Sequence, residues 1–371
     1  MNMSIAKPKL CIVTPCHWTG AFGGAEQQIL LFVNELVRRE ICDLTYVASD
    51  VDKTYKANSY KLERIIRKPS LHRAGYIPDG SQLLKILGYV RPDIIYQRVG
   101  CAYTGVAAYY AKVNGCKMVW HISSDMNVLP LRYDRYKSGN IIARYLDKKI
   151  LEYGIRHSTN IIAQTRYQGE MLRKYYDRRP TKIIPNYQPI PDLKEKPIQP
   201  IRIAWISNLK PMKRPELFIR LANAFESCSD VQFIMLGQAY NTNWCTQIVQ
   251  DIKSHGNIQY LGKKTQDEVN EILSQSHLLV NTSAYEGFPN TFIQAWMRGV
   301  PVISMDVNPD NILVEKGAGL VSKSFEGLCR DVELLVYDKE LRINMAHNAR
   351  SHAINNHSSR NLEAVIQEVF G

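Results

Sequence analysis

The chain has 371 residues, of which 45% are hydrophobic and 22% are charged. A chain of this length and composition can bury two hydrophobic cores, which excludes a largely disordered protein, a collagen, a coiled coil and a small disulfide-stapled scaffold. The formal net charge of +12 comes from the first half, because residues 1–190 hold 29 Lys and Arg against 15 Asp and Glu. We therefore expect the first half to meet something anionic: nucleic acid, an acidic membrane surface or a phosphorylated ligand.

Three basic runs carry much of this charge, at 64–73, 132–149 and 166–179. The alternative interpretation is that each run is only the solvated face of a helix. No helix-turn-helix, zinc-finger or RNA-recognition pattern accompanies the charge, so we expect no nucleic-acid partner.

Targeting and cysteine patterns indicate the compartment. No stretch approaches the roughly 18 consecutive apolar residues of a membrane-spanning helix, and the first residues form no secretory h-region. The eight cysteines are scattered, without a C-x-x-C pair. We therefore expect a cytoplasmic protein with reduced thiols that needs neither structural metal nor disulfides.

Short apolar runs alternate with amphipathic segments along the whole chain, which predicts alternating strands and helices. In the first half, strands are predicted at 9–14, 44–47, 93–97, 118–122, 160–164 and 182–185, and helices at 28–38, 81–87 and 103–113. After a proline-rich, polar segment at 188–200, strands are predicted at 202–206, 231–236, 257–261, 277–281 and 301–305, and helices at 214–225, 267–274 and 291–298.

This order implies parallel sheets that are covered by helices on both faces. We predict an α/β protein with two Rossmann-like, doubly wound domains that face each other across a cleft. The N-terminal domain is placed at 1–190, the linker at 191–200 and the C-terminal domain at 201–371. The last helix, about 359–371, is a candidate to pack back on the N-terminal domain. Ligands of such domains bind at the carboxyl ends of the strands.

Three loops at predicted strand ends carry chemistry. Gly23 and Gly24 lie in a glycine loop that opens a helix, where backbone N–H groups suit a phosphate; a tight strand-to-helix turn is the alternative. The segment 207–214 brings Lys210, Lys213 and Arg214 to the end of a strand, where an ammonium can neutralise a diphosphate; a basic surface turn is the alternative.

The third loop, within 280–302, is the most informative. Glu286 precedes the start of a helix near Thr291, so a carboxylate that can accept hydrogen bonds from sugar hydroxyls lies beside helix-terminal amides. Gln294 follows eight residues after Glu286, inside that helix. The alternative is a helix cap followed by a core helix.

Taken together, these loops resemble glycosyltransferase family 4, the retaining nucleotide-sugar transferases of the GT-B fold. The resemblance covers nearly the whole chain. It is carried by the GGAE turn, the KRPELFIRLANAF segment, the Pro185-Asn186 step, and EGFPN followed by GVPVI, of which the last block is the most specific.

The resemblance implies roles for individual residues. Glu286 matches the first Glu of the family's E-x7-E motif, which contacts the donor sugar, and Lys213 matches its diphosphate-binding lysine. His121 matches the histidine beside the donor sugar; from the residues alone it reads as a core histidine. The remaining donor-binding positions are the glycine loop and the segment after Glu286: Gly23, Gly24, Gly287, Phe288, Pro289, Asn290 and Thr291.

Two positions depart from the family pattern. The second Glu of E-x7-E, which binds the ribose hydroxyls, is Gln294, and an amide oxygen is a weaker acceptor than a carboxylate. The diphosphate-binding Arg is Asn208, so a cation is missing unless Lys210 or Arg214 compensates. Both changes bear on donor affinity, and they leave open a catalytically weak member that only binds nucleotide sugars.

The implied reaction moves a sugar from a UDP- or GDP-linked donor to an acceptor hydroxyl, with retention at the anomeric carbon. We expect no metal and no cofactor, since the nucleotide sugar is a substrate, and Asp125 is a candidate base. The basic first half suits a polyprenyl-diphosphate-linked glycan acceptor and an anionic membrane surface. We therefore expect a peripheral enzyme at the inner face of the plasma membrane that builds O-antigen or capsule. A soluble transferase that acts on a small metabolite is the alternative.

Overall fold

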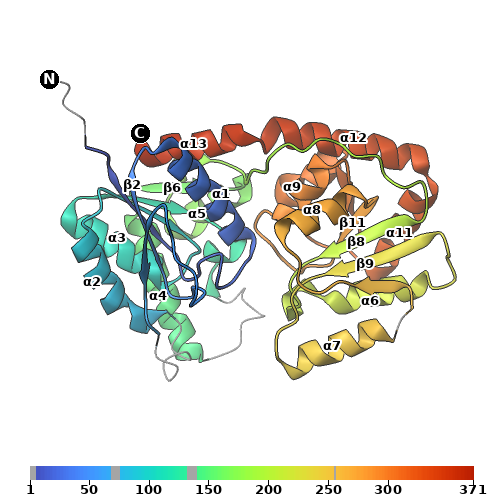
Figure 1. Cartoon of the computed structure of the whole chain (residues 1–371), viewed down its shortest axis with the longest axis horizontal. Helices are drawn as coiled ribbons and strands as arrows, with labels where there is room; N and C mark the ends of the chain where they lie inside the picture. Colours follow the sequence, from blue (N-terminus) through green and yellow to red (C-terminus); the bar gives the residue numbers. More distant parts are fainter. Residues whose placement is uncertain (1–5, 68–75, 132–139, 255) are drawn as a thin grey trace. The chain divides into compact units, whose positions relative to one another are not determined.

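The computed structural model describes residues 6–67, 76–131, 140–254 and 256–371. The chain divides into two compact units, of which the first comprises Met1–Pro185 and Leu362–Gly371 and the second Asn186–Asn361. The first unit is coloured blue to green in Figure 1, and the second yellow-green to red, with the end of the red helix returning to the first unit.

The first unit contains a parallel sheet of seven strands among the described residues, in the order β3-β2-β1-β4-β5-β6-β7. Chain order reverses direction beside β1, which is the mark of a doubly wound sheet. The strands are β1 (Lys9–Val13), β2 (Asp43–Ala48), β3 (Lys61–Arg64), β4 (Ile94–Arg98), β5 (Lys117–His121), β6 (Asn160–Ala163) and β7 (Lys182–Ile183).

Helices cover both faces of this sheet. One face packs against α2 (Gly80–Val90), α3 (Ala102–Asn114), α4 (Ile141–His157) and α5 (Arg166–Tyr176) in a single hydrophobic core. On the other face α1 (Gly24–Arg39) buries Phe32 against Tyr96 of β4, with ring centroids 4.9 Å apart. The C-terminal helix α13 (Ser359–Phe370) is tied to this unit by an ion pair between Arg39 and Glu363.

The second unit repeats the same winding with six described strands, in the order β10-β9-β8-β11-β12-β13. These are β8 (Ile201–Ile206), β9 (Val231–Leu236), β10 (Ile258–Tyr260), β11 (Leu278–Asn281), β12 (Val302–Ser304) and β13 (Gly319–Val321). The order reverses between β8 and β11, so the loops that follow these two strands flank the point where ligands of such sheets bind.

Two helical layers complete the second unit (Figure 1). The first core joins the sheet to α6 (Pro215–Ala224), α7 (Asn243–Lys253) and α11 (Phe325–Tyr337). The second core joins it to α8 (Gln266–Ser274), α9 (Asn290–Met297), α10 (Ile312–Glu315) and α12 (Lys339–Asn356).

The proline-rich segment is fastened to the second unit. The backbone N–H of Gln188 donates to the carbonyl of His357 at 2.9 Å, and Arg350 donates to the carbonyl of Pro191 at 3.1 Å. Farther along, the Lys196 ammonium donates to the carbonyl of Ser276 at 2.5 Å. The change of unit therefore lies at Pro185, before this segment rather than within it.

In the described part of the chain, no helix combines the length and the apolar character needed to cross a membrane. Of the basic runs, 64–73 and 132–149 lie partly outside the described residues, whereas 166–179 includes α5.

Candidate active site

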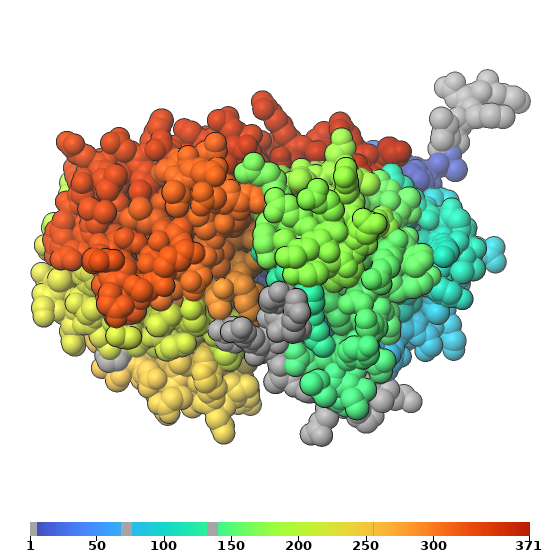
Figure 2. All heavy atoms as spheres, turned by 180° about the vertical axis from the view of Figure 1, so that it is seen from behind, coloured from blue at the N-terminus to red at the C-terminus, as the bar shows by residue number. Residues whose placement is uncertain are grey.

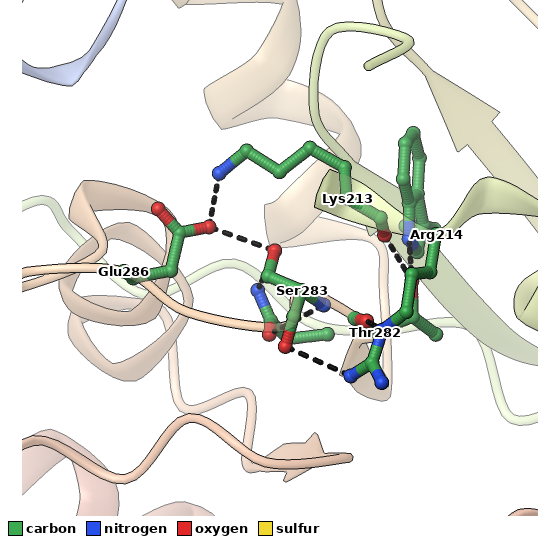
Figure 3. Close-up of polar contacts among 7 residues, drawn as sticks. Lys213, Arg214, Thr282, Ser283 and Glu286 are labelled. Carbon is green, nitrogen blue, oxygen red and sulfur yellow. Dashed lines mark hydrogen bonds and ion pairs between the residues drawn. The ribbon is translucent and has the colours of Figure 1, made fainter. Parts of the chain in front are cut away.

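An ion pair joins the two loops at the switch point of the second unit. Lys213 ends the short 3-10 helix η5 (Pro211–Lys213) that follows β8, and Glu286 lies in the loop after β11. The ammonium of Lys213 contacts Oε1 of Glu286, which also accepts a hydrogen bond from the Ser283 hydroxyl at 2.8 Å (Figure 3). The two charged side chains are 17% and 18% exposed, so they are shielded but reachable from solvent. A phosphate that reached Lys213 would compete with Glu286 for its ammonium.

Arg214 holds the backbone of these two loops together. Its Nε donates to the carbonyl of Thr282 at 2.6 Å, its Nη2 donates to the carbonyl of Ser283 at 3.0 Å, and it also pairs with Asp306. The Thr282 hydroxyl in turn donates to the carbonyl of Lys213 at 2.6 Å. Figure 3 shows Arg214 and Lys213 pointing in different directions from adjacent positions. Arg214 therefore fixes the loop that carries Glu286 while its own charge is matched by Asp306.

Asn208 stands where the family pattern has an arginine, and it has a backbone partner. Its Oδ1 accepts a hydrogen bond from the N–H of Gln238 at 3.2 Å, which ties the loop after β8 to the loop after β9. The second candidate to replace the missing cation, Lys210, lies over the ring of Tyr240 at 5.8 Å and is exposed. Lys210 is thus the cation near Asn208 that can turn toward an anion.

The EGFPN segment forms the amino end of α9, which begins at Asn290. Pro289 is its N-cap in an extended conformation, and no side chain of the described residues caps it. A helix start of this kind presents backbone N–H groups and a partial positive charge, as the sequence predicted. Phe288 is 5% exposed, and its ring centroid lies 4.7 Å from that of His357.

Asn186 holds this segment in place. Its Nδ2 donates to the carbonyl of Phe288 at 3.1 Å and to the side-chain oxygen of Asn290 at 2.9 Å. Nδ1 of His357 donates a hydrogen bond to the carbonyl of Asn186 at 2.8 Å, so Asn186 is itself fixed. The sequence marked the Pro185-Asn186 step only as part of the resemblance. Nothing in the sequence around Asn186 reveals that its partners lie more than 100 residues away.

Gln294 is a buried residue of α9, eight positions after Glu286. It is 2% exposed, and its Nε2 donates to Gln266 and Asn270 of α8.

In the first unit, His121 ends β5 and is 2% exposed. Its Nδ1 lies 2.7 Å from the Tyr96 hydroxyl and 3.2 Å from Nη1 of Arg98. An arginine can only donate, so Nδ1 accepts and the proton of the neutral ring sits on Nε2. Burial, and after it the Arg98 guanidinium, hold the pKa of His121 well below its ordinary value of 6.5. His121 is therefore a neutral hydrogen-bond donor through Nε2, an atom without a hydrogen-bond partner among the described residues.

The other first-unit candidates lie in the segments that follow β1 and β5, two strands that β4 separates in the sheet. Gly23 is the N-cap of α1, and Gly24 is its first residue. Asp125 begins a short 3-10 helix after β5, and its Oδ1 accepts a hydrogen bond from Nε2 of Gln168 at 2.9 Å.

The structure thus brings Lys213 and Glu286 into direct contact, and both follow strands of one sheet. It places Asn208 in the same loop as Lys213, and Gln294 on the helix that the EGFPN segment begins. Gly23, Gly24, His121 and Asp125 belong to the other unit. Asn186, Ser283 and Arg214 are the positioning residues whose roles the sequence did not reveal.

Two family models match the chain. Residues 22–187 match the model described as Glycosyltransferase Family 4, and residues 190–352 match Glycosyl transferases group 1. Relatives include an uncharacterised glycosyltransferase of Methanocaldococcus jannaschii, 25% identical over 61% of this chain and 58% of that protein. One subunit of the human phosphatidylinositol N-acetylglucosaminyltransferase is 23% identical over 53% of this chain and 42% of its own length. The N-acetyl-α-D-glucosaminyl L-malate synthase of Bacillus anthracis is 25% identical over 44% of each chain. The chain therefore spans about half the length of the relatives it matches.

Solved structures share the whole fold. HepE of Anabaena, solved in complex with UDP and glucose, has a TM-score of 0.76 at 17% identity and covers 97% of this chain and 98% of its own. WaaG, a glycosyltransferase involved in lipopolysaccharide biosynthesis, has a TM-score of 0.77 at 14% identity over 98% of this chain and 100% of its own. At these identities the likeness shows the fold, two parallel-sheet α/β domains.

Proposed function

This chain belongs to the glycosyltransferases of the GT-B fold, and from that premise we propose that it transfers a sugar from a nucleoside-diphosphate sugar to a hydroxyl of a glycan acceptor, with retention at the anomeric carbon. The observation that carries the proposal is the Lys213–Glu286 pair, which lies at the switch point of the second sheet beside the amino end of α9. A cation, a carboxylate and helix-terminal amides are the groups that a diphosphate joined to a sugar requires.

Each group has a task in the proposed reaction. The bond from the anomeric carbon to the diphosphate breaks, the acceptor oxygen bonds to that carbon on the same face, and the acceptor proton passes to the leaving diphosphate. Lys213 and the first amides of α9 stabilise the charge that develops on the diphosphate. Glu286 accepts hydrogen bonds from hydroxyls of the donor sugar, and His121 donates one through its neutral Nε2. Asp125 remains the candidate to assist in removing the acceptor proton.

We propose that the donor is a UDP- or GDP-linked sugar and that the reaction needs neither metal nor cofactor. UDP is supported by the complex of HepE, which has the same fold. Metal independence is tested by comparing turnover in EDTA with turnover in added Mg²⁺ or Mn²⁺, and equal rates are expected.

We further propose a lipid-linked acceptor and a location at the inner face of the plasma membrane. The names of two similar proteins support it, since one acts on phosphatidylinositol and the other takes part in lipopolysaccharide biosynthesis. The surface of α4 supports it independently. Four large apolar side chains in its first two turns are exposed, namely Ile141 (71%), Ile142 (66%), Tyr145 (52%) and Leu146 (46%).

These four residues share one face of α4, because they follow the i, i+1, i+4, i+5 pattern of a helix. The Lys149 ammonium lies 5.5 Å from the ring of Tyr145, and α5 adds exposed Arg173 and Lys174. Residues 140–185, green in Figure 2, form a continuous part of the surface of the first unit. An apolar stripe with cationic flanks fits the headgroup region of an anionic bilayer.

A soluble transferase that acts on a small metabolite is the second candidate, supported by the similarity to the malate-glycosylating enzyme. One experiment separates these functions. The protein is incubated with UDP- and GDP-sugars and either a polyprenyl-diphosphate-linked glycan or small hydroxyl compounds, and the product is examined by NMR. We expect turnover on the lipid-linked acceptor and the donor's anomeric configuration in the product. Inversion would refute retention, and absence of turnover with tight nucleotide-sugar binding would indicate a non-catalytic member.

A further inference from the structure

The amide of Gln294 is held in one orientation by two side chains of α8. Its Nε2 lies 2.9 Å from Oε1 of Gln266 and 3.0 Å from Oδ1 of Asn270. An amide nitrogen carries two hydrogens, so these two acceptors use both of them. Gln266 and Asn270 are four residues apart on α8 and therefore lie on the same face of that helix.

The oxygen of the same amide is in a different situation. Oε1 of Gln294 has no hydrogen-bond partner among the described residues, although the whole residue is only 2% exposed. Because both donors face α8, the oxygen must point the other way. The amide thus presents an acceptor alone, as a carboxylate would, although it carries no charge.

We propose that Gln266 and Asn270 are positioning residues that aim the oxygen of Gln294 at a ribose hydroxyl of the nucleotide. This inference rests on the proposed function, because it takes the segment from Glu286 to α9 as the nucleotide-sugar site. The pattern of the family places a glutamate here, and a freely rotating glutamine would present donor and acceptor alike. Because both hydrogens of the Gln294 nitrogen are bound to α8, only the oxygen is left to face the ribose, as a carboxylate oxygen would be. This oxygen is neutral, so it is a weaker acceptor than the carboxylate of a glutamate.

The test measures binding of UDP and GDP by titration calorimetry, and then compares the tighter one with its 2′-deoxy and 3′-deoxy analogues. We expect the wild-type protein to bind at least one deoxy analogue roughly three- to tenfold more weakly, the range of one neutral hydrogen bond. Asn270→Leu has nearly the same shape but cannot accept a hydrogen bond, and combined with Gln266→Leu it leaves the Gln294 amide without either of its acceptors on α8, so the amide is released. In this variant the preference for the ribose hydroxyl should fall to about onefold.

Asn270→Asp is the matched control, because its carboxylate still accepts from Nε2 of Gln294, and it should keep the wild-type preference. Gln294→Leu, which has no acceptor oxygen, should also reduce the preference for the ribose hydroxyl to about onefold. Melting temperatures of all variants show whether the fold is kept, and the ratio between nucleotide and deoxy analogue is insensitive to a general loss of stability.

The outcomes separate the two claims. If the wild type binds neither UDP nor GDP, the proposed function and this inference both fall. If it binds one of them but the Gln266→Leu/Asn270→Leu variant keeps the full preference for the ribose hydroxyl, the inference alone is overturned. A folded Gln294→Leu variant that keeps the full preference would overturn it as well.

Discussion

The ammonium of Lys213 and the carboxylate of Glu286 form an ion pair between loops that follow adjacent strands, 73 residues apart in the chain. The pair sets two groups with different proposed tasks against each other. Lys213 is to hold the diphosphate, whereas Glu286 is to hold the sugar. Substitutions at the two positions should therefore have different signatures.

Lys213→Ala should lower kcat/KM by about 10- to 100-fold and weaken binding of the nucleoside diphosphate, because a charge-assisted hydrogen bond contributes about 1.5–3 kcal/mol. Lys253→Ala, an exposed lysine at the end of α7 in the same unit, is the control and should change kcat/KM by less than about threefold. Steady-state kinetics and calorimetry measure both. Equal effects of the two variants would contradict the role given to Lys213.

Glu286→Gln should lower kcat while leaving the affinity for the free nucleoside diphosphate unchanged or higher. The physical reason is that the substitution removes the charge that competes for the Lys213 ammonium and also removes the charged acceptor for the donor sugar. A variant that loses nucleoside-diphosphate affinity but keeps kcat would reverse this assignment.

Asn186→Ala should destabilise the protein by about 1–3 kcal/mol, because it leaves the buried carbonyl of Phe288 and the side chain of Asn290 without their donor. It should also lower kcat/KM, since the EGFPN segment is no longer fixed. Urea unfolding and kinetics measure the two effects. Asn241→Ala, exposed on the same unit, is the control and should change neither.

Buried and half-buried histidines make the fold sensitive to mild acid. Burial is the main cause that lowers the pKa of His17, His277 and His352 to about 4 and that of His357 to about 3. The unfolded chain, with a histidine pKa near 6.5, binds protons before the folded chain does. The stability that these neutral rings contribute is therefore complete above pH 6.5 and is lost as the pH falls toward 4.

Each of these histidines should reduce the free energy of unfolding by up to about 1.4 kcal/mol for every pH unit below 6.5. Urea unfolding at pH 7.5, 6.5 and 5.5 measures the slope, and His352→Gln should make it shallower. The measurements stay above pH 5, because below that pH Glu35 and Glu268 take up protons in the unfolded chain. In the folded chain their hydrogen bonds lower their pKa values to about 2. A free energy of unfolding that is constant across this range would contradict the account.

The exposed face of α4 should decide membrane binding. Replacing both Ile141 and Ile142 by Ser should reduce sedimentation with anionic phosphatidylglycerol vesicles at least tenfold, because burying one isoleucine contributes about 1.5–3 kcal/mol. Ile343→Ser, 54% exposed on α12, is the matched control and should not reduce it. If the wild-type protein does not sediment with anionic vesicles at low salt, the proposal of membrane binding is wrong.

The two doubly wound sheets followed from local sequence patterns. β9 lies at 231–236 as predicted, because an unbroken apolar run between polar turns has few other interpretations. α1 begins at Gly24, four residues before the predicted start, since Gly and Ala at a helix start look like a loop. α4 and α5 were noticed only as basic runs, because the density of Lys, Arg and Tyr in these segments was interpreted as a charged surface rather than as a helix.

The chemistry of the site was predictable where it depends on residue type at a strand end, as at Lys213 and Glu286. It was not predictable where it depends on partners distant in the chain. Asn186 acts across about 100 residues, and the polarity of Gln294 depends on α8, an element that no local pattern links to it. The tautomer of His121 likewise depends on Arg98 of the neighbouring strand.

A crystal structure of the protein with its tighter nucleoside diphosphate, UDP or GDP, tests the central claim most directly. The account predicts a diphosphate oxygen within hydrogen-bond distance of Nζ of Lys213 and beside the first amides of α9, with Glu286 released from the ion pair. A nucleotide bound elsewhere on the protein, with Lys213 still paired to Glu286, would contradict it.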